Sequence, residues 1–186
     1  MGQPPKHPTL LALGYSEAAM LLAEPHGLKI DAVISIHGVH EYAVDASSVA
    51  HRLVLRFDDV EGIDWSDPAR AEAAWARQKW AKEIGRPLTP PAMDDAQTII
   101  DFARRTADCN GAVLCQCQAG ISRSPAAALL CLATWTGEGH EHYCIDRLLR
   151  IRPAAVPLRD LIAFGDTLLE RQGALLRASM NRRQIG

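Results

Sequence analysis

AVLCQCQAGISRSPAAALLCLA occupies residues 112–133 and contains three consecutive patterns. Ala112 to Gln116 is a compact apolar run, which is typical of a buried strand. The stretch from about Arg123 to Thr136 has a helical pattern, and Gly137 ends it. A short glycine-containing loop, residues 117–122, lies between them. This order predicts a loop that sits at the N-terminus of a helix.

The composition of this loop is that of an anion-binding site. A tight loop at a helix N-terminus turns successive backbone N–H groups inward, and together they form a cradle for an anion. Glycine at 120 permits backbone angles that a side chain would forbid. The planar guanidinium of Arg123 can hold two phosphate oxygens at once. We therefore expect a phosphate, or a sulfate in its place, to be bound by Gln118, Ala119, Gly120, Ile121, Ser122 and Arg123.

Cys117 is the candidate nucleophile at the start of the loop. The helix N-terminus and Arg123 create a positive field that favours the thiolate form of a cysteine. A thiolate can attack phosphorus in line and form a phosphocysteine. Ser124 places a hydroxyl beside the loop, where it can hydrogen-bond the sulfur and ease its departure when the intermediate is hydrolysed.

Strands and helices alternate along most of the chain. This alternation predicts an α/β fold with a central, largely parallel twisted sheet flanked by helices. A helix start is indicated at Ser16 and another at Asp67, which precedes a proline. The other expected strands are Thr9–Gly14, Asp31–His37 and His51–Phe57. The other expected helices are 17–24, 67–84, 94–107, 142–150 and 158–177.

The chain around this loop resembles a known family, the dual-specificity branch of the cysteine-based protein tyrosine phosphatases. The family's signature loop is written HCxxGxxRS, and Cys117, Gly120, Arg123 and Ser124 fall on its fixed positions. The segment 151–157, with Ile-Arg-Pro and a later proline, is similar to the family's "RP…P" stretch. The resemblance extends loosely from His51 to the last helix. It implies a dual-specificity phosphatase-like fold and phosphoester hydrolysis.

One position of the signature departs from the family. The residue before the nucleophile is normally His, which helps to stabilise the thiolate, and here it is Gln116. Glutamine can still form hydrogen bonds, but it carries no charge. We therefore expect weaker thiolate stabilisation and a retained site.

The resemblance also implies an aspartate that protonates the leaving oxygen and later activates water. In the family this residue follows a strand that precedes the cysteine strand. Asp58 and Asp59 follow the strand that ends near Phe57, and the family pattern favours Asp59. Asp58 is the second candidate and Asp64 the third. The adjacent residues Asp58 and Asp59 could instead simply cap a turn.

The separation between Asp59 and Cys117 exceeds the usual family spacing. The extra residues form the tryptophan-bearing helical stretch and the proline-rich segment after it. We predict a single phosphatase domain, residues 1–186, with a helical insertion at about 60–91 near the rim of the site. Three tryptophans, Trp65, Trp75 and Trp80, lie in this insertion. Their packing with the insertion onto the domain is favoured over a peptide-binding aromatic surface.

The resemblance favours a phosphoprotein phosphatase that acts through a phosphocysteine. Lipid-phosphatase relatives tend to carry basic residues inside the loop, and this loop has none, so phosphotyrosine esters are favoured over phosphoinositides. Whether phosphoserine and phosphothreonine are also substrates is left open. The alternatives are a catalytically weak or silent phosphoprotein-binding module, and a sulfur-transfer or arsenate-reducing enzyme.

Composition excludes several other classes. The 186 residues have a formal net charge of −2, so no global basic field points to nucleic acid or an acidic membrane. No apolar run approaches a membrane span. Five cysteines, an odd number, do not indicate a secreted disulfide framework, so a cytoplasmic location is predicted. His37 and His40 lack further ligands at metal-binding spacing. No metal or other cofactor is expected, and the expected partner is a phosphorylated protein or peptide.

Overall fold

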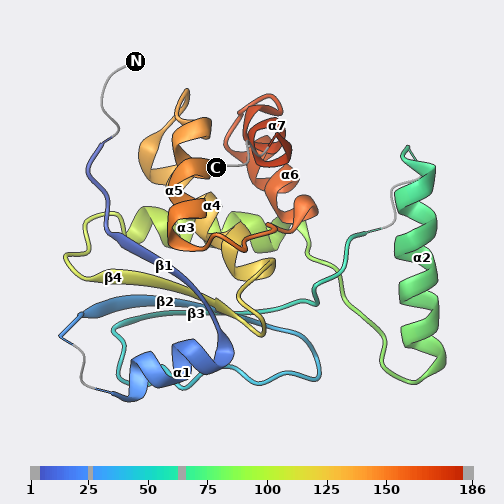
Figure 1. The fold of residues 1–186 in the computed structure, drawn as a ribbon, viewed down its shortest axis with the longest axis horizontal. Coiled ribbons are helices and arrows are strands. Elements are labelled where there is room, and N and C mark those ends of the chain that lie inside the picture. Colours follow the sequence, from blue (N-terminus) through green and yellow to red (C-terminus); the bar gives the residue numbers. More distant parts are fainter. Residues whose placement is uncertain (1–4, 25–26, 63–65, 182–186) are drawn as a thin grey trace.

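The computed structural model describes residues 5–24, 27–62 and 66–181. Two residues discussed above, Asp64 and Trp65, therefore lie outside the described part of the chain. The core of the structure is a four-stranded sheet in which each pair of neighbouring strands is parallel (Figure 1). The strand order β1-β4-β2-β3 confirms the prediction of a parallel sheet. The strands are β1 (Thr9–Gly14), β2 (Ile30–His37), β3 (His51–Arg56) and β4 (Ala112–Cys117).

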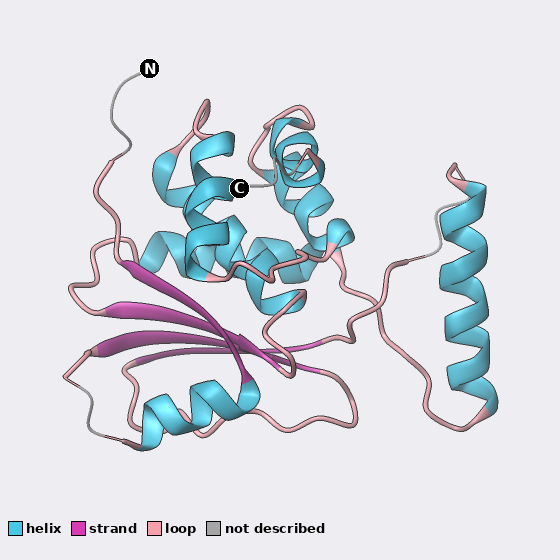
Figure 2. Ribbon diagram, viewed as in Figure 1, coloured by secondary structure: helices cyan, strands magenta, loops and turns pink. Residues whose placement is uncertain are grey.

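Helices cover both faces of this sheet (Figure 2). One face packs against α1, through a small cluster that includes Val33 and Leu114. The opposite face packs against a larger group of helices in the main hydrophobic core. This two-sided cover makes the fold α/β, as predicted. The helices are α1 (Tyr15–Ala23), α2 (Pro68–Glu83), α3 (Met93–Arg105), α4 (Arg123–Thr136), α5 (Glu141–Ile151), α6 (Arg159–Leu168) and α7 (Ala174–Met180).

Helix α4 occupies the centre of the larger layer. Its sequence is apolar or small on nearly every side, which is the pattern of a fully buried helix. All but two of its residues, Thr134 and Trp135, are buried. Because β4 leads through the loop directly into α4, the rigid core holds both ends of the loop.

The single helix predicted from Leu158 to Arg177 is wrong, because α6 and α7 are separate helices. The backbone between them has positive φ angles at Glu170, Gln172 and Gly173. The buried carboxylate of Asp166 accepts hydrogen bonds from the N–H groups of Gly173 (2.5 Å) and Leu176 (3.0 Å). This side chain therefore caps the second helix and stabilises the break.

The two predicted helix caps also differ from the structure. Helix α1 begins at Tyr15, and the residue before it is Gly14, whose N–H donates to Glu17 Oε2 (2.8 Å). Ser16 therefore lies inside the helix. Asp67 does precede α2, but its side chain makes no capping hydrogen bond. Its carboxylate instead lies 3.9 Å from the guanidinium of Arg159.

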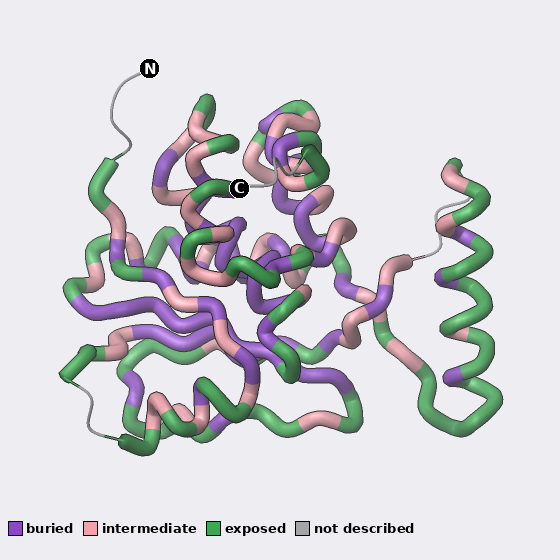
Figure 3. Tube along the Cα trace, viewed as in Figure 1, coloured by how far each residue is buried: buried purple, intermediate pink, exposed green. Residues whose placement is uncertain are grey.

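Helix α2 stands apart from the sheet and the other helices (Figures 1 and 3). Only small alanines, Ala71, Ala74 and Ala81, are buried along it. Trp75 and Trp80 are 46% and 61% exposed, so the prediction that these two tryptophans pack onto the domain is wrong. Among the described residues, no helix is long and apolar enough to cross a membrane.

Candidate active site

The loop after β4 is held from outside by its carbonyl groups. Each of the five carbonyls of residues 118–122 accepts a hydrogen bond from a group beyond the loop. In a trans peptide the N–H points away from the preceding C=O, so the N–H groups of residues 119–123 point toward the opposite side, around Cys117. The donors are Tyr15 N–H to Gln118 (3.1 Å), Arg152 to Ala119 (3.3 Å) and Gly120 (3.0 Å), Val156 N–H to Ile121 (2.6 Å) and Leu158 N–H to Ser122 (3.3 Å).

Arg152 is the side chain that braces the middle of the loop. Its guanidinium also forms an ion pair with Glu17 (2.7 Å), and Glu17 in turn accepts the N–H of Gly14. The arginine lies in the segment that resembles the family's "RP…P" stretch. The structure therefore gives that segment a physical role, which is to hold two carbonyls of the loop outward.

Glycine is required at position 120 for two reasons. Its φ angle is +71°, in the left-handed region that side chains rarely adopt. A β-carbon there would overlap the backbone nitrogen of Gly14 and would lie 2.7 Å from the carbonyl carbon of Leu13. The loop thus crosses the start of α1 at a distance that only glycine allows.

We expect Gly120→Ala to destabilise the protein by roughly 2–5 kcal/mol, because left-handed strain and overpacking add. The matched control is Gly85→Ala. Gly85 has nearly the same φ, +73°, but open space around it, so strain alone should cost about 1–2 kcal/mol. Urea unfolding of the two variants measures the difference. Equal losses would show that the close approach at 120 is unimportant.

Cys117 is buried, with 2% of the residue exposed, and its sulfur lies inside the loop. It accepts a hydrogen bond from Gly120 N–H (3.3 Å) and lies 3.2 Å from Ser124 Oγ. The Ser124 hydroxyl also donates to the Leu13 carbonyl (3.2 Å). With a thiolate, the same hydroxyl proton can turn to the sulfur, so two donors stabilise the negative charge.

Glu41 binds Arg123, and sequence reasoning missed it. The two terminal nitrogens of the guanidinium donate to the two oxygens of Glu41, at 2.6 and 2.9 Å. One of them also donates to the Phe57 carbonyl (3.2 Å). The guanidinium has five N–H groups, and these bonds use three of them. Of the other two, the Nε–H is buried, and its nitrogen has no hydrogen-bond partner among the described residues. The bidentate pair therefore orients Arg123 and leaves the Nε–H and one N–H of Nη2 for an anion.

Burial and pairing oppose each other in this ion pair. Burial alone would raise the pKa of Glu41, but hydrogen bonds from Arg123 and from the N–H of Gly38 outweigh it and lower that pKa. Burial acts to lower the pKa of Arg123, and the carboxylate of Glu41 reverses this and raises it. Both groups are therefore charged at neutral pH.

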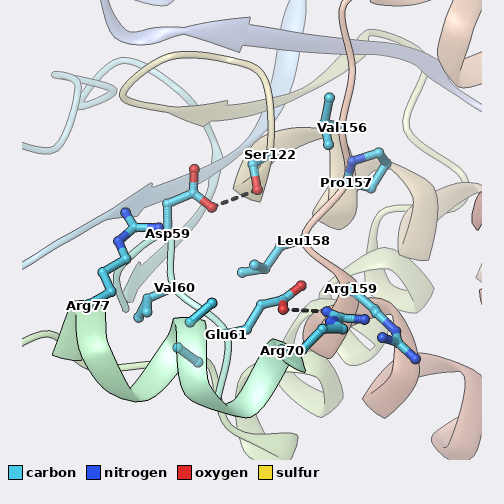
Figure 4. A pocket seen from close by; sticks show the side chains of 12 residues that line it. Asp59, Val60, Glu61, Arg70, Arg77, Ser122, Val156, Pro157, Leu158 and Arg159 are labelled. Carbon is cyan, nitrogen blue, oxygen red and sulfur yellow. Dashed lines mark hydrogen bonds and ion pairs between the residues drawn. The ribbon is translucent and has the colours of Figure 1, made fainter. Parts of the chain in front are cut away.

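The two neighbouring aspartates point to different places. Asp59 Oδ1 accepts a hydrogen bond from Ser122 in the loop (2.6 Å; Figure 4). Asp58 is joined to Thr89, because its Oδ2 accepts the Thr89 N–H (2.8 Å) and its own N–H donates to the Thr89 carbonyl (2.7 Å). The structure thus brings Asp59 to the loop and places Asp58 where the chain returns from α2.

Gln116 lies on the opposite face of β4 from Cys117, since side chains alternate along a strand. It is fully buried, and its Oε1 accepts a hydrogen bond from Ser35 Oγ (2.6 Å) on β2. Its Nε2 has no partner among the described residues. Glutamine at this position therefore links two strands below the loop.

Within residues 5–24, 27–62 and 66–181, no group of three or more His, Cys, Asp or Glu side chains is placed to hold a metal ion. His37 Nδ1 instead donates a hydrogen bond to the neighbouring Gly38 carbonyl (3.2 Å). The polar groups hydrogen-bonded to the Cys117 sulfur are the N–H of Gly120 and the hydroxyl of Ser124.

Solved structures share the fold of this protein, although its sequence matches no family model. No protein-family model matches the sequence, and no curated protein matches it. The structure is similar to Tk-PTP in its active form, with a TM-score of 0.52 and 14% identity over 90% of this chain and 94% of that one. It is also similar to PTPMT1, with a TM-score of 0.50 and 18% identity over 90% of this chain and 98% of that one. The chain has the fold of the cysteine-based protein tyrosine and dual-specificity phosphatases.

Proposed function

We propose that this protein is a phosphoprotein phosphatase that hydrolyses phosphotyrosine esters through a phosphocysteine intermediate. The observation that carries the proposal is the buried, unpartnered Nε–H of Arg123 beside the loop that surrounds Cys117. A buried donor without a partner costs free energy, and a bound phosphate oxygen would satisfy it. The inward N–H groups of the loop supply further donors to the same anion.

The first step of the proposed reaction transfers the phosphoryl group to sulfur. The Cys117 thiolate attacks phosphorus, an S–P bond forms, and the bond from phosphorus to the leaving oxygen breaks. Asp59 in its acid form gives its proton to that oxygen. Ser122 holds one oxygen of Asp59 and fixes the direction of the carboxyl group.

The second step regenerates the enzyme. Asp59, now a carboxylate, takes a proton from water while the water oxygen attacks phosphorus. The S–P bond breaks, inorganic phosphate leaves, and Ser124 stabilises the departing thiolate at 3.2 Å. The loop N–H groups and Arg123 bind the equatorial oxygens throughout. No metal or other cofactor is needed for either step.

The substrate class rests on the side chains of the loop. PTPMT1, one of the similar structures, was also crystallised with PI(5)P (TM-score 0.50, 17% identity). The loop of the present chain contains no basic side chain between Cys117 and Arg123 that would bind a second phosphate of such a lipid. We therefore propose a phosphorylated protein or peptide as the substrate. Whether phosphoserine and phosphothreonine are also cleaved is left to substrate tests.

The rest of the chain completes the proposal. We propose one phosphatase domain in which residues 60–91, including α2, are an insertion at the rim of the site. The segment leaves the body after Asp59 and returns at Thr89, which Asp58 holds. A cytoplasmic location remains a prediction that rests on the odd number of cysteines.

A catalytically silent phosphate-binding module is the second candidate. Glu41 occupies both terminal nitrogens of Arg123, and Gln116 stands where the family has His. Both features would be compatible with anion binding without rapid turnover. This candidate shares the anion site with the phosphatase and differs only in the chemical steps.

Hydrolysis of p-nitrophenyl phosphate by the wild-type chain tests the proposal directly. We expect turnover in the presence of EDTA and competitive inhibition by inorganic phosphate. Calorimetry on the same preparation measures the binding of inorganic phosphate. Binding without turnover would reject the phosphatase and favour the silent module, and turnover that EDTA abolishes would contradict the metal-free mechanism.

A further inference from the structure

A cavity of about 320 Å³ lies between α2 and the candidate site (Figure 4). Asp59 and Ser122 form one side of it, so the cavity adjoins the place where the leaving group must sit. Helix α2 forms another side, and the segment 156–159 closes a third. When the phosphate of a substrate is bound in the loop, the groups that flank the phosphorylated residue therefore lie at this cavity.

Three arginines line the cavity, and two of them have an acidic partner among the described residues. Glu61 forms an ion pair with Arg70. Arg159 lies 3.9 Å from Asp67, just beyond the cavity. Arg77 forms no ion pair or hydrogen bond with any described residue, although it lines the same cavity. Figure 4 shows its side chain extending from α2 toward Asp59.

An unpaired guanidinium in a recess is suited to a carboxylate or a phosphate group. Arginine binds such groups through two parallel hydrogen bonds, and the attraction is strengthened where the walls are apolar. The walls here are apolar in part and would contact the aliphatic stem of a side chain. They are formed by Val60, Ala73, Ala74, Val156, Pro157 and Leu158.

We propose that Arg77 is a specificity-determining residue that binds an acidic side chain flanking the phosphorylated residue of a peptide substrate. The inference rests on the proposed function, because it needs the phosphate in the Cys117 loop. A peptide is favoured over a lipid head group for two reasons. The loop has no basic side chain between Cys117 and Arg123, and the cavity has apolar walls that can contact the aliphatic stem of a side chain whose carboxylate binds Arg77. Residues 60–91 would then contribute substrate recognition and leave the chemistry to the body of the domain.

The test measures binding by the Cys117→Ser chain, in which hydrolysis cannot interfere. Two fluorescent phosphotyrosine peptides are compared by anisotropy; they differ only in having Glu or Gln on both sides of the phosphotyrosine. We expect the Glu peptide to bind about threefold to tenfold more tightly, the range for one partly exposed charge pair. Adding Arg77→Gln should bring that ratio to about one. Arg77→Lys should keep part of it, and the preference should weaken as salt is raised.

Lys82→Gln is the matched control, since it removes the same charge from the same helix at a residue that does not line the cavity. It should leave the ratio unchanged. Equal binding of the two peptides when Arg77 is present would overturn the inference, as would a ratio that survives Arg77→Gln or the absence of any peptide binding. A larger effect of Arg77→Gln on a soluble inositol bisphosphate than on the Glu peptide would assign the cavity to a head group and reject the peptide.

Turnover of p-nitrophenyl phosphate by wild type separates this inference from the proposed function. Turnover combined with equal peptide binding would reject the role of Arg77 and keep the phosphatase. A peptide preference that depends on Arg77, without turnover in wild type, would keep the role of Arg77 and reject the phosphatase.

Discussion

Replacing Cys117 with serine is expected to lower the turnover of p-nitrophenyl phosphate by roughly 10³-fold or more. The alcohol of serine is a far weaker nucleophile than a thiolate. Among the described residues, the hydrogen-bond partners of the Cys117 sulfur are the N–H of Gly120 and the hydroxyl of Ser124, and neither group is a base that could activate serine. The substitution is close in size and leaves the donors of the loop in place. Binding of inorganic phosphate should therefore remain within a few-fold of wild type.

Cys109→Ser is the control for this experiment. Cys109 is half-buried and precedes β4, at the end of that strand away from the loop, so its loss should leave turnover unchanged. Trapping of a phosphorylated wild-type chain by rapid acid quench, followed by mass spectrometry, would identify the intermediate on Cys117. Residual hydrolysis near the wild-type rate in Cys117→Ser would exclude a phosphocysteine mechanism.

The local patterns predicted the sheet and most of the helices well. The apolar run before Cys117, the small residues after Arg123 and the glycine that follows them specify a strand, a buried helix and its end through near-neighbour rules alone. The C-terminal helices show where those rules stop. Their separation depends on Asp166, which reaches forward to the N–H groups of Gly173 and Leu176. An apolar periodicity that continues across 158–177 contains no sign of that contact.

Contacts between distant segments were the part of the site that patterns could not predict. Glu41 follows β2 and meets Arg123 because β2 and β4 are neighbours in the sheet and their carboxyl ends lie at one edge. A search for polar residues after each parallel strand would have raised Glu41 as a candidate. The exposure of Trp75 and Trp80 likewise depends on how far α2 stands from the body, which helical periodicity does not encode.

The adjacent aspartates are equivalent in sequence terms and different in the fold. A family resemblance favoured Asp59 by spacing, and the structure supplies an independent reason, because only its carboxylate touches the loop through Ser122. Asp58 bonds both the N–H and the carbonyl of Thr89. Two neighbouring carboxyl groups thus have distinct expected roles, one in proton transfer and one in anchoring the segment that carries α2.

Asp59→Asn is accordingly expected to lower kcat by about 10²-fold on phenyl phosphate, whose leaving oxygen needs a proton. The loss should be about tenfold or less on p-nitrophenyl phosphate, since p-nitrophenolate departs as a stable anion and gains little from a general acid. Steady-state kinetics with the two esters at one pH measures both values. The dependence on the leaving group distinguishes a missing acid from a disturbed loop, which would slow both esters alike.

Asp58→Asn provides the matched comparison, one position away and with the same change of group. The amide can still accept a hydrogen bond from the Thr89 N–H, so we expect a modest loss of stability, about 1 kcal/mol. The ratio of the kcat values for the two esters should change little. A strong dependence on the leaving group in Asp58→Asn, with none in Asp59→Asn, would reverse the assignment of the acid. If neither variant shows that dependence, the proton must come from another group or from water, and the hydrogen bond from Ser122 to Asp59 would then serve only to hold the loop.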